Sequence, residues 1–87
     1  MRMNVDVVAT GASTEVVISD AQKERLGWER RIPVAFELDG QRFRATVVHM
    51  HGQWCFVANS SMRERGLTPG RRYRLDIARD QEPEPFD

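Results

Sequence analysis

The sequence contains few of the residues that mark secreted or membrane proteins. Its 87 residues include a single cysteine, Cys55, which cannot form a disulfide within the chain. No apolar run approaches the ~20 residues that cross a bilayer, and the chain does not start with the apolar segment of a signal peptide. We therefore expect a cytoplasmic protein with no membrane partner.

The chain also has no net charge, because 13 basic residues balance 13 acidic ones. This balance argues against a dedicated nucleic-acid binder, for which an isoelectric point above about 9 is typical. The charges are unevenly spread, however. Residues 1–39 carry five basic and seven acidic side chains, residues 40–79 carry eight and two, and residues 80–87 carry four acids. The middle segment is therefore strongly basic and the C-terminal segment is acidic.

Apolar residues alternate with polar ones in several segments, which predicts half-buried β-strands. The expected inward positions are Val5 and Val7, then Val34, Phe36 and Leu38, then Phe43, Ala45 and Val47, and finally Tyr73, Leu75 and Ile77. Asp39-Gly40 predicts a tight hairpin turn between two of these strands.

Two short helices interrupt the strands. The first is expected over residues 21–26, capped by Asp20 and ended by Gly27, and the second over 60–65, capped by Asn59 and ended by Gly66. Sliding the chain on itself without gaps, at an offset of 39, superimposes the caps, the glycines and the inward positions of the last strands. The same offset places Trp28 on Leu67.

This repetition predicts an all-β protein with two short helices, built from two β-β-α-β units over residues 1–39 and 40–79. One unit offers a sheet face too small to bury alone, so two units related by a pseudo-twofold axis should close into one barrel over residues 1–79. The acidic tail, residues 80–87, is expected to be disordered.

Much of the chain resembles a bacterial family catalogued as domain of unknown function 1905. The resemblance covers residues 17–79 and rests on Gly27, Arg31-Ile32-Pro33-Val34, Asp39-Gly40, Phe43-Arg44, Asn59, Met62-Arg63 and Gly66-Leu67-Thr68-Pro69-Gly70. It implies a double-split β-barrel and no assigned activity. This sequence departs from the family at His51-Gly52-Gln53, where members carry a longer glycine-rich loop. Members are often followed by a second segment, whereas this chain is expected to stand alone.

A looser resemblance covers residues 52–79, which look like the swapped-hairpin unit of transition-state regulators and antitoxins. In those proteins two chains dimerise to make the barrel, and basic side chains on its sheet and loops hold DNA. The resemblance implies the same architecture here, with both halves in one chain.

One short stretch holds three side chains that are chemically suited to zinc: His49, His51 and Cys55. The sequence has no further histidine or cysteine to complete a four-ligand site, and a tight turn lies among the three. We therefore expect ordinary strand and turn histidines, Cys55 in the core, no metal and no cofactor.

The usual catalytic patterns are also missing. Ser60 and Ser61 lie in the expected first turn of a helix, where serine is common, without a histidine–aspartate pair near them in the sequence. Acid pairs such as Asp20 and Glu24, or Glu37 and Asp39, are expected on exposed faces. We therefore predict no catalytic residues.

The candidate binding residues are five arginines. Arg42 and Arg44 are expected to point outward from one strand, Arg72 and Arg74 from another, and Arg63 lies in the second helix. Pairing of the two strands would merge the first four into one basic patch. Nucleic-acid phosphate, an acidic protein or the acidic tail of the chain itself are its expected occupants, and a merely solvated face is the alternative.

The sequence thus favours a non-catalytic binding or interaction module for an unidentified protein or small ligand. We expect a monomer, with a homodimer as the alternative. The alternative function is a DNA-binding transcriptional regulator or antitoxin that uses the arginine-rich face. The net charge of −2 on residues 1–39 argues against a symmetric grip on DNA and places the function on residues 40–79.

Overall fold

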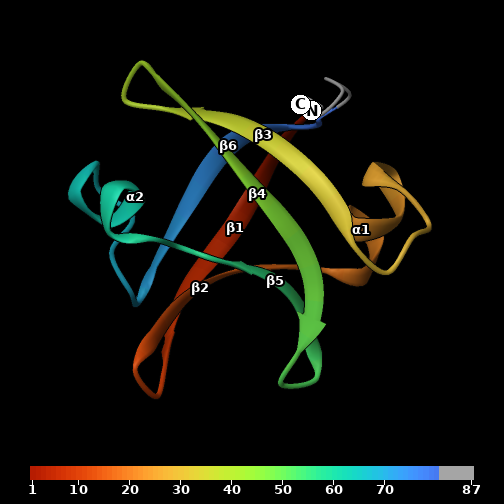
Figure 1. The fold of residues 1–87 in the computed structure, drawn as a ribbon, viewed down its shortest axis with the longest axis horizontal. Coiled ribbons are helices and arrows are strands. Elements are labelled where there is room, and N and C mark those ends of the chain that lie inside the picture. The colour runs from red at the N-terminus through yellow and green to blue at the C-terminus, as the bar shows by residue number, and fades with distance from the viewer. Residues whose placement is uncertain (81–87) are drawn as a thin grey trace, which may run out of the picture.

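Residues 1–80 are described by the computed structural model, and they form six antiparallel strands and two short helices (Figure 1). In chain order the elements are β1 (Arg2–Thr10), β2 (Ser13–Ile18), α1 (Asp20–Leu26), β3 (Ile32–Leu38), β4 (Gln41–Met50), β5 (Gln53–Val57), α2 (Ser60–Glu64) and β6 (Arg71–Arg79). The strands close into a barrel in the order β1-β2-β5-β4-β3-β6. The prediction of a β-barrel with two short helices is confirmed. The predicted disordered tail lies outside the described residues, apart from Asp80.

The interior of the barrel is filled by alternate side chains of all six strands. Phe36 lies at its centre, with its ring 5.8 Å from that of Phe43 and 5.3 Å from that of Phe56. The predicted inward positions are buried at Val5, Val7, Val34, Phe36, Phe43, Val47, Leu75 and Ile77, and half-buried at Leu38, Ala45 and Tyr73. Period-two alternation therefore identified the core face of four of the strands.

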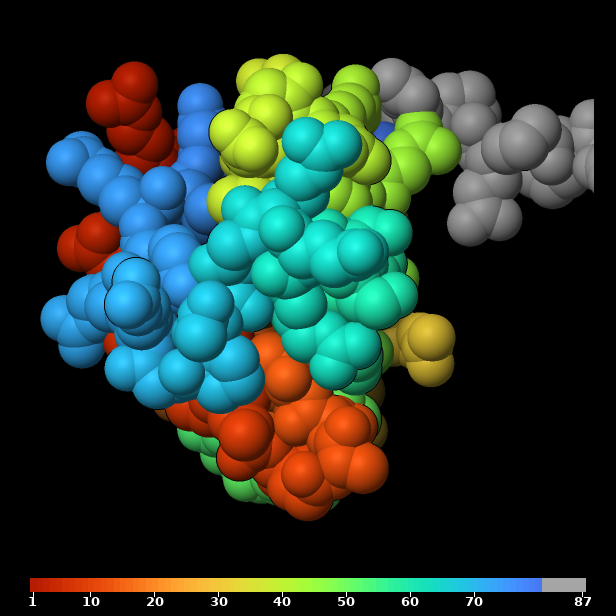
Figure 2. Space-filling view, turned by 90° about the vertical axis from the view of Figure 1, so that its left-hand side faces the viewer, coloured from red at the N-terminus to blue at the C-terminus, as the bar shows by residue number. Residues whose placement is uncertain are grey.

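The helices lie on opposite sides of the barrel, and the β1–β2 and β4–β5 hairpins project from it in the same direction (Figure 1). Figure 2 shows the side on which α2 and the segment leading to β6 cover the barrel. Met62 and Leu67 are buried beneath that cover. The predicted tight turn joins β3 to β4, where Asp39 and Gly40 both have positive φ, of 54° and 78°. Each helix thus covers part of the core.

The N-cap of α1 is Ser19, so the prediction of Asp20 as the cap is wrong. The Ser19 hydroxyl accepts a hydrogen bond from the Gln22 backbone N–H at 3.1 Å, and the Gln22 side chain accepts one from the Ser19 N–H at 2.8 Å. This reciprocal capping box needs a glutamine or glutamate three positions after the cap, a spacing that only Ser19 satisfies here. Asn59 caps α2 as predicted, and its side chain accepts from the Met62 N–H at 2.9 Å.

The gapless repeat at an offset of 39 also needs correction. In the first hairpin Val8 faces Glu15, and in the second Val48 faces Cys55, so these strands correspond at an offset of 40. The helix caps Ser19 and Asn59 are related by the same offset.

The register of β3 and β6, in contrast, fits an offset of 39. Val5 faces Tyr73, whereas its counterpart Ala45 faces Val34. Val34 thus lies 34 − 19 = 15 positions after the cap Ser19, whereas Tyr73 lies 73 − 59 = 14 positions after the cap Asn59, and a gapless alignment cannot reproduce that difference.

None of the helices formed by residues 1–80 has the length and apolar character needed to span a membrane.

Candidate functional site

The five predicted binding arginines do not form one patch. Strand β4, which carries Arg42 and Arg44, is separated from β6 by β3. The outward neighbours of Arg44 across that sheet are Ala35 and then Ala78, and Arg42 faces Glu37. The expected merging of the arginines of β4 and β6 is therefore wrong, because two strands bring basic side chains together only when they pair.

Most of these arginines also have acidic neighbours. Arg44 forms an ion pair with Asp80 at 2.9 Å, and the Arg42 guanidinium lies 3.8 Å from the same carboxylate, which is only 10% exposed. Arg72 binds Asp6 of β1 at 3.0 Å. The first residue of the acidic tail thus contacts both arginines of β4, which is one of the occupants that the sequence left open.

The remaining two predicted residues lie apart from each other. Arg63 lies on the exposed side of α2, and Arg74 lies on β6 opposite Asn4 of β1. Neither forms an ion pair within residues 1–80. The predicted set is thus spread over three elements of the barrel.

The three side chains suited to zinc point to different places. The ring of His49 packs edge-on against Trp54 at 4.9 Å, whereas His51 Nε2 approaches Glu15 at 3.5 Å. Cys55 is fully buried, as expected. Within residues 1–80, no three His, Cys, Asp or Glu side chains come together to hold a metal ion.

Glu15 is an unexpected feature, because its carboxylate is only 1% exposed. The Thr10 hydroxyl lies at 3.5 Å from it, and His51 covers it from the β4–β5 turn. Burial and the adjacent Glu15 carboxylate raise the pKa of the Cys55 thiol to about 11. The thiol therefore stays protonated at neutral pH, and protonated thiols are poor nucleophiles.

A hollow with a different character lies between β4, β5 and the segment that follows α1. It has a volume of about 490 Å³ and is lined by Arg30, Arg31, Val48, His49 and Trp54. Two residues with aromatic rings, one valine and two arginines therefore line the same space, which we call the Trp54 pocket. Its two arginines form no ion pair within the described chain, in contrast to those at positions 44 and 72.

A buried lysine supports the wall of the Trp54 pocket. Lys23 of α1 is only 8% exposed, and its ammonium lies 4.4 Å from the centroid of the Trp54 ring. The same ammonium donates a hydrogen bond of 3.0 Å to the carbonyl oxygen of Trp28. This cation–π contact and hydrogen bond compensate the burial of the charge, and they tie the segment after α1 to the wall of the pocket.

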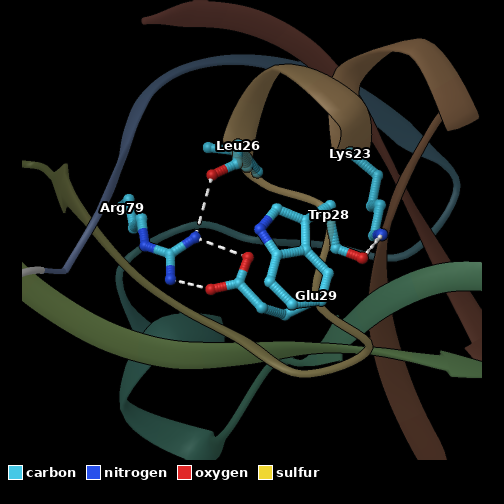
Figure 3. Close-up of polar contacts among 5 residues, drawn as sticks. All are labelled: Lys23, Leu26, Trp28, Glu29 and Arg79. Atoms are coloured by element: carbon cyan, nitrogen blue, oxygen red, sulfur yellow. Dashed lines mark hydrogen bonds and ion pairs between the residues drawn. The ribbon is translucent and has the colours of Figure 1, made fainter.

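The segment Gly27–Arg31, which we call the Trp28 loop, is also held by Arg79 of β6 (Figure 3). The Arg79 guanidinium makes a two-pronged contact with the Glu29 carboxylate and also donates to the Leu26 carbonyl oxygen at 3.4 Å. Gly27 makes room for this arrangement, because a Cβ there would clash with Arg79 Nη1 and lie 2.6 Å from Glu29 Oε1. The φ of Gly27 is 161°, so close approach explains the glycine better than backbone conformation does.

Trp28 itself is 87% exposed, although the backbone around it is held at several points. The repeat alignment placed Trp28 on Leu67, which is 0% exposed, so the expected equivalence of these two residues is wrong. Sequence reasoning missed the Trp54 pocket altogether. The available signal was a tryptophan directly after a helix stop, followed closely by Arg30-Arg31.

Two further hollows are weaker candidates for a binding site. One, of about 520 Å³, runs along the N-terminal end of α1, but its polar residues Ser19 and Gln22 already bind each other, as do Asp6 and Arg72. The other, of about 440 Å³, lies on the outer face of β3 and its neighbours and is lined by no aromatic side chain besides the core residue Phe36. Of these three hollows in the described chain, the Trp54 pocket is the one that combines unpaired cations with ring surface.

Comparison of the chain with protein-family models, with curated proteins and with solved structures found no match.

Proposed function

We propose that this chain is a non-catalytic binding module whose ligand is an organic anion carrying a planar aromatic ring, held in the Trp54 pocket. Nucleotides have this chemistry, since each combines a phosphate with a base. The base would pack against Trp54 and His49, and the phosphate would lie against Arg30 and Arg31. Guanidinium groups suit this role because they make two parallel hydrogen bonds to phosphate oxygens.

The observation that carries this proposal is that Arg30 and Arg31 line the pocket without an ion-pair partner within residues 1–80. They face a hollow lined by aromatic rings and have no carboxylate partner within residues 1–80. Two of the arginines on the outer faces of the strands, in contrast, are already engaged: Asp80 binds the one at position 44, and Asp6 binds the one at position 72. An anion entering the pocket would therefore not have to displace an ion pair.

A purely binding role is supported by the chemistry of the nucleophilic side chains. The pKa of Cys55, raised to about 11, keeps this thiol protonated, and the side chain is buried. Ser60 and Ser61 are exposed at the start of α2, where they have no basic partner among the described residues. A cytoplasmic location also fits the lone cysteine, because a reducing compartment keeps such a thiol free.

For the architecture, we propose a duplicated, double-split barrel, as the resemblance to the domain of unknown function 1905 family implies. The support is the strand register: at an offset of 40, the pairing of β1–β2 becomes that of β4–β5. Where β2 pairs with β5, Val16 lies opposite Phe56, the residue 40 positions later in the chain. The two residues that the offset relates therefore face each other, as they would on a twofold axis. The cyclic strand order is likewise unchanged when β1, β2 and β3 are exchanged with β4, β5 and β6. A monomer suffices, since both halves of the barrel lie in one chain.

Duplex DNA bound by the arginines of β4 and β6 was the alternative expected from the sequence. The separation of these strands by β3 and the ion pairs with Asp80 and Asp6 weigh against it. We therefore rank it below the nucleotide-type ligand and use it as a control in the test.

The proposal is tested with adenosine monophosphate as the probe, titrated into isotope-labelled protein and followed by backbone and indole NMR shifts. We expect shifts at Trp54, His49 and the two pocket arginines. The variant Arg30→Gln/Arg31→Gln should bind roughly a hundredfold or more weakly, because charge-assisted hydrogen bonds contribute about 1.5–3 kcal/mol each and two of them are lost. Both side chains are exposed, so the fold should persist.

The matched control is Arg72→Gln/Arg74→Gln, which removes the same charge from β6. This variant should bind adenosine monophosphate within about twofold of the wild type. An equal loss in both variants would mean that binding reflects overall charge rather than the pocket. Absence of any shift at millimolar nucleotide would contradict the proposed function.

A further inference from the structure

The most unusual surface feature is an indole ring displayed on a rigid support. The backbone of the Trp28 loop is held by Lys23, which binds the Trp28 carbonyl, while Arg79 binds the Glu29 side chain and the carbonyl of Leu26, just before the loop (Figure 3). In Figure 2 the segment between α1 and β3, in gold, stands clear of the body of the molecule. An apolar ring that stays in water while its backbone is fixed is preorganised for contact, because binding then costs little conformational entropy.

The Trp28 loop and the Trp54 pocket form one continuous feature. The loop contributes Arg30 and Arg31 to the pocket lining, and the Lys23 ammonium contacts both the Trp54 ring and the Trp28 carbonyl. The exposed Trp28 therefore lies in the same short loop as two arginines that line the pocket and have no ion-pair partner within residues 1–80. Aromatic platforms that alternate with cations are the arrangement by which proteins hold single-stranded nucleic acids.

The shape of the pocket favours a polymer over a free nucleotide. Sites for small molecules usually bury about 70–90% of their ligand, whereas the Trp54 pocket is open to solvent. A ligand that continues out of the pocket and reaches Trp28 would gain a second stacking contact. A duplex cannot do this, because its bases are already stacked on each other.

We propose that the ligand of this site is single-stranded nucleic acid, with one base against Trp54 and His49, a phosphate at Arg30 and Arg31, and a neighbouring base on Trp28. This inference rests on the proposed function and specifies its ligand. In this proposal Trp28 contributes to the affinity for a polymer but not to the affinity for a mononucleotide.

The test measures fluorescence anisotropy of labelled ten-nucleotide oligothymidylate and oligouridylate, and of a duplex of equal length, with the full chain. Both single strands should bind more tightly than the duplex, and the difference between the two single strands reports the combined effect of the 2′-hydroxyl and the thymine methyl group. Trp28→Ala should weaken single-strand binding roughly tenfold, since stacking of a base on an aromatic ring contributes about 1–3 kcal/mol. Trp28→Phe, which keeps a ring, should restore most of the affinity.

The matched control is Val57→Ala, which also shortens an exposed apolar side chain but lies on β5 outside the pocket lining. It should leave oligonucleotide binding unchanged. Binding of adenosine monophosphate should be the same in Trp28→Ala and the wild type. The logarithm of the affinity for the single strand should fall with the logarithm of salt concentration with a slope of about −0.7, as expected for the one phosphate held by Arg30 and Arg31.

Suppose that adenosine monophosphate binds at the pocket. Equal affinity for duplex and single strand would then overturn this inference and leave the proposed function intact. An oligonucleotide affinity that Trp28→Ala does not change would do the same. If neither nucleotide nor oligonucleotide bound, both proposals would fail.

Discussion

At the scale of single residues, the chain keeps one carboxylate and one thiol buried side by side. Glu15 and Cys55 lie on neighbouring strands β2 and β5, on the faces opposite the core residues Val16 and Phe56. Burial disfavours the thiolate, and repulsion by the carboxylate adds to that effect, so the pKa of Cys55 is raised from 9.0 to about 11. The consequence is a measurable dependence of stability on pH.

The folded chain should lose stability as the pH rises from 9 to 11. Between these values the unfolded thiol has lost its proton while the folded thiol still holds it, so folding is favoured fully below pH 9 and progressively less above it. The loss attributable to Cys55 should be about 1 kcal/mol at pH 10. Urea unfolding at pH 7.5, 9 and 10 measures it as the difference between the wild type and Cys55→Ala. A difference that does not change with pH would contradict the raised pKa.

At the scale of elements, α1 positions the Trp54 pocket although it contributes no residue to its lining. Its Lys23 supports the Trp54 ring, and its C-terminal end leads directly into the Trp28 loop. The helix has only seven residues, too few to be stable in isolation. Its stability therefore depends on the capping box and on the packing of Leu26 against the core.

Removing the cap of α1 should destabilise the protein measurably. Ser19→Ala loses the hydrogen bond to the Gln22 N–H, which should lower the free energy of unfolding by about 1 kcal/mol. Asp20→Asn is the control, because it removes only a first-turn charge, worth about 0.3–1 kcal/mol. Urea midpoints compare the two variants. If Asp20→Asn were as damaging as Ser19→Ala, the first-turn charge rather than the capping hydrogen bond would account for the stability of α1.

At the scale of the whole molecule, β6 closes the barrel. It pairs with β1 along one side and with β3 along the other, and it is the only direct link between these two strands in the described chain. Its inward side chains Leu75 and Ile77 belong to the same core as Phe36 and Phe56. A core this small has no part that can be lost independently, so we expect the two halves to unfold together.

The double variant Leu75→Ser/Ile77→Ser should therefore unfold the entire chain, β4 and β5 included. Each substitution should cost at least about 3 kcal/mol, and together they approach the full stability of a small domain. The amide NMR spectrum should collapse to that of an unfolded chain. The matched control in the same strand, Arg72→Gln/Arg74→Gln, should keep a folded spectrum. Persistence of native β4–β5 signals in the serine variant would show that the halves fold separately.

The sequence by itself determined the features that depend on neighbours close along the chain. Alternation identified the inward face of β1, β3, β4 and β6, and Asp39-Gly40 identified a hairpin turn. Asn59 was identified as a cap because a capping side chain reaches only the N–H groups of the first helical turn. The choice of Asp20 over Ser19 failed because both residues can cap, and only the position of Gln22 distinguishes them.

The tertiary structure decided which distant segments meet. It placed β3 between β4 and β6, which divided the predicted arginine patch, and it brought Asp80 to Arg42 and Arg44. It also gathered residues 30–31, 48–49 and 54 around one hollow, with Lys23 behind its wall. Sequence spacing carries no record of such proximity, because barrel closure and strand order follow from burying all six strands at once. The candidate site is therefore a product of the closed barrel and not of any one motif.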